Sequence, residues 1–178
     1  PMVAIRSGDA VLVGLLATDR TPRGDLVQVS EAGQVGTPTL GTNGVEIAVA
    51  FAYRASASAP WSLRVAHGPH GVALGKAAAF AVPEGGPGGD AFAPALAGMA
   101  DGRWILAWTE GTSGARVVRA VTLSSSFAPV GAPVVISPAE ASGGQPTLAV
   151  SGDSALAVYL TSAKKGGYEV WGTTLACR

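Results

Sequence analysis

Few residues in this chain combine in a way that could perform chemistry. The two histidines, His67 and His70, form the sequence HGPHG, with no carboxylate next to them. A metal site usually takes three or four ligands, and the Gly-Pro between the histidines indicates a turn. We therefore expect two ordinary loop imidazoles and no bound metal or cofactor; a weak or shared metal site is the alternative. The sequence also lacks the motifs of a serine nucleophile elbow, a phosphate-binding loop and a calcium loop.

Most carboxylates have structural explanations. Asp9, Asp101 and Asp153 lie in recurring Gly-Asp or Asp-Gly pairs, where an aspartate side chain bonds to nearby backbone. Glu110 and Glu169 border expected hairpin loops, so we expect both to be solvated. No catalytic residue is assigned, because the sequence shows no nucleophile and base in a recognisable arrangement.

Composition places limits on the class of protein. The 178 residues are 48% hydrophobic and 13% charged, which suits a single domain with a real core. The 25 glycines and 12 prolines favour short strands joined by turns. The formal net charge of zero and the absence of a basic stripe argue against a nucleic-acid partner. No apolar run approaches the roughly 18 residues of a membrane span, and the single Cys177 is either inert or pairs outside the chain.

One pattern recurs along the chain. The stretch 94–123 holds a proline, a short apolar strand, an Asp-Gly turn, a long apolar strand and a further strand, and the stretch 146–175 repeats it. Segments from Pro1 and Pro38 share the first part, with each proline expected at the entry to a strand. In each segment a pair that tolerates a tight hairpin follows the proline: Gly8-Asp9, Asn43-Gly44, Asp101-Gly102 and Gly152-Asp153.

The second strand of each unit is apolar on both faces, which predicts burial between layers. These strands are expected at 10–16, 45–53, 103–109 and 154–160. In the third strand of one unit Arg119 alternates with apolar residues, which suggests the edge of a sheet. The units are 1–37, 38–93, 94–145 and 146–178. The first is short, and its end, 29–38, resembles the passage 136–146 that leads into the last unit.

Units of about 50 residues with up to four strands are typical of a β-propeller. The chain resembles the Pro-x-Leu/Ala, Gly-Asp, apolar-strand-Trp repeats of bacterial secreted and cell-surface propeller proteins. The resemblance implies small radially packed sheets and a secreted or cell-envelope setting, and it carries over no catalytic residue. We predict an all-β, propeller-like domain of four units with three to four antiparallel strands each. A two-layer β-sandwich is the alternative.

The fourth unit ends without an outer strand. We therefore expect an incomplete or strand-sharing propeller, in which another segment or chain covers the open edge. The expected function is a non-catalytic binding or scaffolding module whose partner is a protein or a glycan.

A glycan-cleaving enzyme is the alternative function. Propellers of the sialidase type place arginines and acidic groups on one face, although the S-x-D-x-G-x-x-W box of that family is absent here. Four arginines are candidates for such a cluster: Arg64, Arg103, Arg116 and Arg119.

Binding is expected on loops, which carry recognition in many rigid scaffolds. The segments 54–60, 110–115 and 161–167 occupy the same place in successive units and should emerge on one face, together with Ser56 and Ser58. Trp61 follows the longest of them and is the expected aromatic anchor, with packing beneath the loop as its alternative role. The predicted binding residues are Arg54, Trp61, Glu110, Thr112, Lys164 and Lys165.

Overall fold

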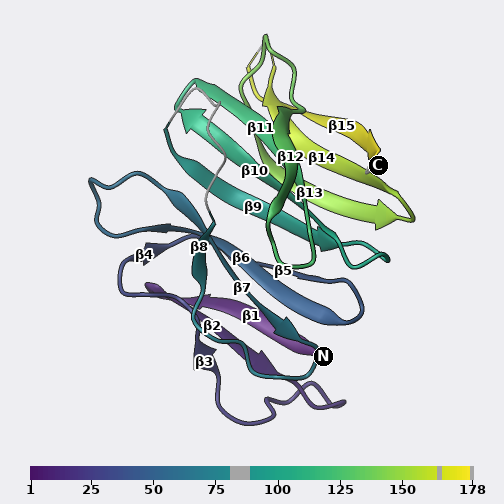
Figure 1. Cartoon of the computed structure of the whole chain (residues 1–178). Coiled ribbons are helices and arrows are strands. Elements are labelled where there is room, and N and C mark those ends of the chain that lie inside the picture. The colour runs from purple at the N-terminus through teal and green to yellow at the C-terminus, as the bar shows by residue number, and fades with distance from the viewer. Residues whose placement is uncertain (81–88, 164–165, 177–178) are drawn as a thin grey trace.

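In a computed structural model, which describes residues 1–80, 89–163 and 166–176, the chain forms four antiparallel sheets and no helix (Figure 1). The first sheet holds β1 (Met2–Ser7), β2 (Ala10–Leu15) and β3 (Val27–Gln28). The second holds β4 (Gln34–Val35), β5 (Thr39–Thr42), β6 (Glu46–Arg54), β7 (Ser62–Pro69) and β8 (Ala78–Phe80). The third holds β9 (Ala91–Gly98), β10 (Trp104–Thr112), β11 (Ala115–Leu123) and β12 (Pro129–Val135). The fourth holds β13 (Gly143–Ser151), β14 (Ser154–Ser162) and β15 (Tyr168–Ala176).

The predicted all-β class with short antiparallel sheets is confirmed. The strands pair in chain order, as β9, β10, β11 and β12 do in the third sheet, except that β4 and β5 both pair with β6 in the second sheet. Strands of successive sheets also contact one another, β5 against β9 and β9 against β13. These three form the inner side of a fan of sheets. Within the described residues, no helix is long and apolar enough to cross a membrane.

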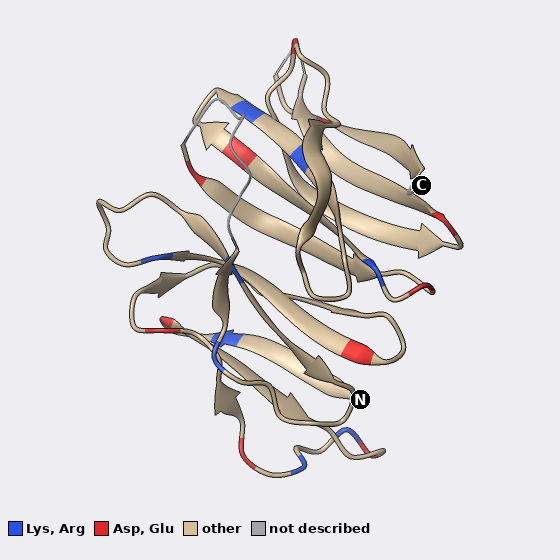
Figure 2. Cartoon of the chain, in the orientation of Figure 1, with Lys and Arg blue, Asp and Glu red and all other residues tan. Residues whose placement is uncertain are grey.

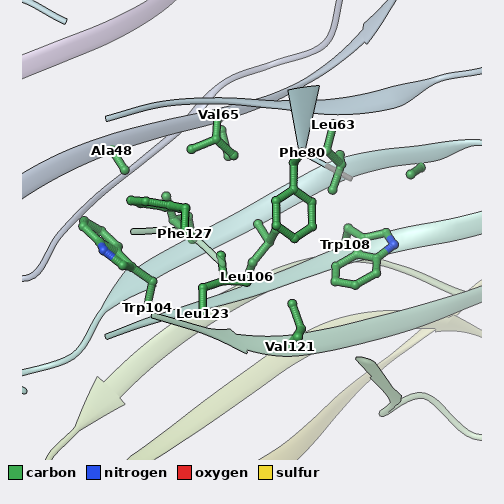
Figure 3. Close-up of a cluster of buried hydrophobic side chains, with 13 residues drawn as sticks. Ala48, Leu63, Val65, Phe80, Trp104, Leu106, Trp108, Val121, Leu123 and Phe127 are labelled. Atoms are coloured by element: carbon green, nitrogen blue, oxygen red, sulfur yellow. The ribbon is translucent and has the colours of Figure 1, made fainter. Parts of the chain in front are cut away.

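The packing between the second and third sheets forms a core of aromatic and aliphatic side chains (Figure 3). Trp104 and Trp108 of β10 are fully buried there, against Leu63 and Phe80 from the second sheet. This is the predicted core role of the aromatic residues. Truncating such a side chain to alanine typically costs about 3–5 kcal/mol.

Burial on both faces, expected for all four long strands, holds only for the two central sheets. In β6 every residue from Ile47 to Tyr53 is buried, and in β10 every residue from Trp104 to Gly111. In β14 burial alternates: Ala157 is fully buried, whereas its neighbour Leu156 is 44% exposed. The difference in burial depends on where each sheet lies. A described sheet packs on both sides of the second and third sheets, but on only one side of the fourth.

The first unit does not match the others in the expected alignment. The amide of Val11 in β2 donates to Ser30 Oγ at 3.0 Å, and the amide of Val118 in β11 donates to Ser137 Oγ at 2.9 Å. The same two strand residues accept backbone bonds from Val29 and Ile136.

These matching bonds make β2 the counterpart of β11, the third strand of its sheet. Strand β1 is therefore a second strand, and the first sheet as described has no inner strand. The sequences 29–38 and 136–146 are similar because each segment begins by bonding back to the third strand of its own sheet. The alignment of the first unit by its proline is therefore wrong.

Two of the four repeated prolines lie at the entry to a strand as predicted, because β1 begins directly after Pro1 and β5 directly after Pro38, whereas Pro94 and Pro146 lie inside strands. Strand β9 begins three residues before Pro94, and β13 begins three residues before Pro146. The residues that precede these prolines, Ala93 and Gln145, have left-handed φ values of 47° and 54°. The ladder shifts register there, so each proline follows a bulge, where a missing amide donor is tolerated.

Glycine at position 98 allows two inner strands to touch. A Cβ at Gly98 would overlap the backbone of Thr42 and Asn43. At this contact Asn43 Nδ2 donates to the carbonyl of Gly102 at 3.0 Å, which links the first hairpin turns of two sheets.

We expect Gly98→Ala to lower the free energy of unfolding by about 1–3 kcal/mol, because the overlap is with backbone that must shift. Gly75→Ala is the matched control, since a Cβ at Gly75 meets no atom within 4 Å and its φ lies outside the left-handed region. Urea unfolding of both variants measures the difference, and equal stability would contradict the close packing of β5 against β9.

Candidate functional site

A pocket of about 540 Å³ lies where the first three sheets meet. Its volume falls in the range typical of small-molecule sites. The side chains that give it chemical character come from five separate segments: Arg6, Asp9, Gln34, Arg54, Trp61 and Phe92.

Irregular inner strands create this space. Gly36 and Thr37 separate β4 from β5, and Ala93 is the bulge residue of β9. All three line the pocket. Because the chain leaves the regular ladder at these points, the inner strands cannot fill the space with side chains from a continuous pleat.

Arg54 and Trp61 form one wall of the pocket. The guanidinium carbon of Arg54 lies 4.5 Å from the centroid of the Trp61 ring. Arg54 Nε donates to Gln34 Oε1 at 2.7 Å and Nη1 to the carbonyl of Ala57 at 3.0 Å. These contacts fix a half-buried arginine against an aromatic ring, an arrangement worth about 0.5–2 kcal/mol as a cation–π pair.

Asp90 anchors Trp61 from the neighbouring segment. Its Oδ1 accepts a 2.8 Å hydrogen bond from the Trp61 amide, and its carbonyl accepts the Gly111 amide at 3.0 Å. A second bond joins the Ala91 amide to the Trp61 carbonyl. Trp61 is therefore held between the second and third sheets, half-buried and lining the pocket.

The first sheet contributes opposite charges to the pocket. Arg6 lies near the end of β1, where its Nε donates to the carbonyl of Gly8 at 3.1 Å. Asp9 follows in the turn and is exposed. Over the described chain, charged residues are scattered and gather into no patch of one sign (Figure 2). Arg6 and Asp9 are therefore not part of a larger charged surface.

The predicted binding residues lie in different places in the structure. Arg54 and Trp61 both line the pocket. Thr112 is exposed at the end of β10, and the hydroxyls of Ser56 and Ser58 lie 3.2 Å apart on an exposed loop. Lys164 and Lys165 lie outside the described residues, as does Cys177.

Glu110 is not solvated. It is 4% exposed, and its Oε1 lies 3.2 Å from Nε of Arg119, which is 7% exposed. Trp108 Nε1 donates to Glu110 Oε2 at 3.0 Å. Residues two apart on a strand share a face, so Glu110 points with Trp108 toward the second sheet, and Arg119 is buried instead of lying at a sheet edge.

We expect Glu110→Ala to destabilise the fold by about 3–5 kcal/mol, because it leaves the Arg119 charge buried without its carboxylate. Thr112→Ala, two residues along the same strand and exposed, should change stability by less than about 0.5 kcal/mol. Thermal and urea unfolding of the two variants tests this, and equal effects would show that the ion pair does not stabilise the fold.

The four arginines proposed to cluster do not converge. Arg64 packs over Tyr53, Arg103 pairs with Asp101, Arg116 packs over Phe92, and Arg119 pairs with Glu110. The arginines that meet at the pocket are Arg6 and Arg54 instead. Sequence reasoning missed Arg6, Asp9, Gln34 and Phe92, because their meeting depends on how separate sheets pack.

The turn role predicted for Asp101 is present in the structure. Its carboxylate accepts the Arg103 amide at 3.0 Å and Arg103 Nε at 2.6 Å. The hydrogen bond from the Arg103 amide has the larger effect and that from the Arg103 side chain the next, and both lower the pKa of the Asp101 carboxyl below its ordinary value. Asp101 is therefore a structural carboxylate.

His67 lies within β7 and not in a loop. Its ring stacks on Phe127 with centroids 4.4 Å apart, and its Nδ1 is 3.9 Å from a Glu46 carboxylate oxygen. His70 is exposed at the following turn. Among the described residues, no group of three or more potential ligands could hold a metal ion.

Comparison with known proteins gives the architecture a name. No protein-family model matches the sequence, and neither does any curated protein. Solved structures do match. A thermostable family-43 glycoside hydrolase has a TM-score of 0.62 at 11% identity, over 97% of this chain and 64% of that one. An α-L-arabinofuranosidase from Lactobacillus brevis has a TM-score of 0.62 at 10% identity, over 94% and 60%. An exo-1,5-α-L-arabinanase from a bovine ruminal metagenomic library has a TM-score of 0.55 at 13% identity, over 98% and 66%.

The likeness shows the fold, a β-propeller, and confirms the predicted architecture. The chain spans about 60–66% of the length of these solved structures. The expectation of a non-catalytic binding or scaffolding module is contradicted by these matches, because all three solved structures are named as glycan-cleaving enzymes.

Proposed function

We propose that this chain is part of a glycan-cleaving propeller enzyme and that the pocket between the first three sheets binds the sugar. The observation that carries the proposal is the make-up of this pocket. A half-buried indole, a fixed guanidinium, an amide and an exposed carboxylate line a single cavity. Pockets of this kind combine an apolar surface with a few placed polar groups.

Each group has a role that its chemistry supports. Trp61 offers ring surface to the apolar face of a sugar, while its backbone stays tied to Asp90. Arg54 and Gln34, already bonded to each other at 2.7 Å, offer donors to sugar hydroxyls. The shared bond holds both side chains in place before the ligand arrives, which lowers the entropy lost on binding.

Cleavage of a glycosidic bond commonly uses two carboxyl groups that flank the scissile bond. One protonates the leaving oxygen, and the other activates water or attacks the sugar directly. Among the described residues that line the pocket, Asp9 supplies one of these groups. The turn that holds Asp9 therefore has a chemical role in this proposal in addition to its structural one.

Arabinose-containing oligosaccharides are the first substrates to test, since two of the similar solved structures are named for arabinose-releasing activities. The proposal includes a secreted or cell-envelope location, the setting of the bacterial repeat proteins that the sequence resembles. Extracellular polysaccharide would be accessible there.

We expect Asp9→Asn to lower kcat on arabino-oligosaccharides by about 10²-fold or more, the usual effect of losing an acid–base group. Asp153→Asn is the matched control, because Asp153 is likewise an exposed aspartate in a Gly-Asp hairpin turn but lies outside the pocket. Trp61→Ala should chiefly raise KM. Product release measured by chromatography decides the matter, and a folded protein that cleaves no glycan of a neutral and acidic panel would overturn the proposal.

A further inference from the structure

The pocket between the first three sheets has more positive than negative side chains. Its described lining includes two guanidinium groups, those of Arg6 and Arg54, and one carboxylate, that of Asp9. The two arginines come from different sheets, Arg6 from β1 and Arg54 from the end of β6. The protein as a whole has a formal net charge of zero, so the positive excess is a property of this pocket.

Neither of these guanidinium groups has a carboxylate partner in the described chain. Arg103 and Arg119 lie 2.6 and 3.2 Å from a carboxylate oxygen. No ion pair joins Arg6 or Arg54 to any described residue. Because an arginine side chain stays protonated, both pocket arginines keep a charge that an anionic ligand can neutralise.

Gln34 adds hydrogen-bond donors to the pocket. Its side chain receives a 2.7 Å bond from Arg54 Nε, and an arginine can only donate. The amide oxygen of Gln34 therefore faces Arg54, which leaves the amide NH₂ group as the end that a ligand can reach. Donors from three of the lining side chains thus stand against the acceptor oxygens of Asp9, with the hydroxyl of Thr37 able to do either. A ligand rich in acceptor oxygens suits such a pocket.

The bonds within the protein leave part of each guanidinium available. Arg54 uses Nε for a side chain and Nη1 for the carbonyl of Ala57, and it stacks on the Trp61 ring. Arg6 uses Nε for the carbonyl of Gly8. Among the described residues, no hydrogen-bond partner takes Nη2 of Arg54 or either Nη atom of Arg6. A planar guanidinium that is already held in place matches the two oxygens of a carboxylate.

We propose that this pocket takes an acidic sugar, a uronic-acid unit whose carboxylate binds Arg6 and Arg54 while its ring lies on Trp61. The assignment rests on the proposed function, because it names the substrate class of the same pocket. One carboxylate supplies the acceptor oxygens that the lining lacks and balances the single excess positive charge. Arabinose has no such group, so a glycan that contains uronic acid should bind better than a neutral arabino-oligosaccharide.

Matched ligands isolate the contribution of the carboxylate. The methyl glycosides of galacturonic and glucuronic acid have the same rings as their methyl esters and as the methyl glycosides of galactose and glucose. NMR titration of the whole chain measures Kd for each. We expect each acid to bind at least about tenfold more tightly than its ester and its neutral counterpart, because hydrogen bonds between charged groups are the stronger ones. The preference should fall as salt is added, since salt screens exposed charges.

Arginine variants test which residues recognise the acid. Arg6→Gln and Arg54→Gln should each lower the affinity for the acids by about tenfold and change the affinity for the esters much less. Arg103→Gln removes the same charge from an arginine that does not line the pocket, so it should leave the preference unchanged. Arg6 is exposed, and its described hydrogen bond is to the carbonyl of Gly8. The Arg6 variant therefore remains informative if the half-buried Arg54 proves necessary for folding, which urea unfolding reveals.

Equal Kd values for an acid and its ester would contradict the acidic-sugar assignment, as would binding of neither. A preference that Arg6→Gln and Arg54→Gln both leave intact would also rule it out. Glycan cleavage is a separate measurement. Uronic acids bound with no glycan cleaved would contradict the enzymatic proposal alone, whereas neutral glycans cleaved with no preference for an acid would contradict the substrate class alone.

Discussion

Burial of both faces of a sheet is the constraint on which the rest of this structure depends. Strand β10 carries Trp104, Leu106 and Trp108 on one face and Ile105 and Ala107 on the other, all buried. Such a strand is stable only between two other sheets, because neither face tolerates water. The radial arrangement, the close approach of the inner strands and the buried Glu110–Arg119 pair all follow from packing sheets against sheets.

The small residues of the chain satisfy this constraint near the inner strands. Gly98 lets β9 approach β5, and Asn43 ties the adjoining turns together. The left-handed residues Ala93 and Gln145 then let the inner strands leave the ladder without ending. The same irregularity that relieves crowding also opens the pocket beside Arg54, so packing and site have a common origin.

Sequence periodicity predicts much of this fold. The turn pairs at Asn43 and Asp101, the long apolar strands and the core role of Trp104 all depend on local patterns, and all are present. The proline alignment failed for the first unit, because the short apolar segments on either side of a Gly-Asp turn look alike whichever pair of strands they form. Hydrogen bonds between distant residues, such as Ser30 with Val11, were needed to identify the strands.

The site was less predictable for a physical reason. Arg54 and Trp61 are near each other in sequence, and their loop signal was sufficient to find them. Arg6, Gln34 and Phe92 join them only through contacts between sheets, which no spacing in the chain encodes. The prediction that Glu110 is solvated was wrong, because a carboxylate at the end of an apolar strand is expected in water unless its buried partner Arg119 is known.

The serine that closes the third sheet affects how such a chain can be recombined. Ser137 follows β12 and bonds back to Val118 within the same sheet, so residues 91–137 form a block that carries its four paired strands and its own closing contact. A gene rearrangement that moves residues 91–137 would therefore move a whole sheet together with the hydrogen bond that closes it. A crossover at Pro94 would instead leave three residues of β9 behind and divide the strand at its bulge.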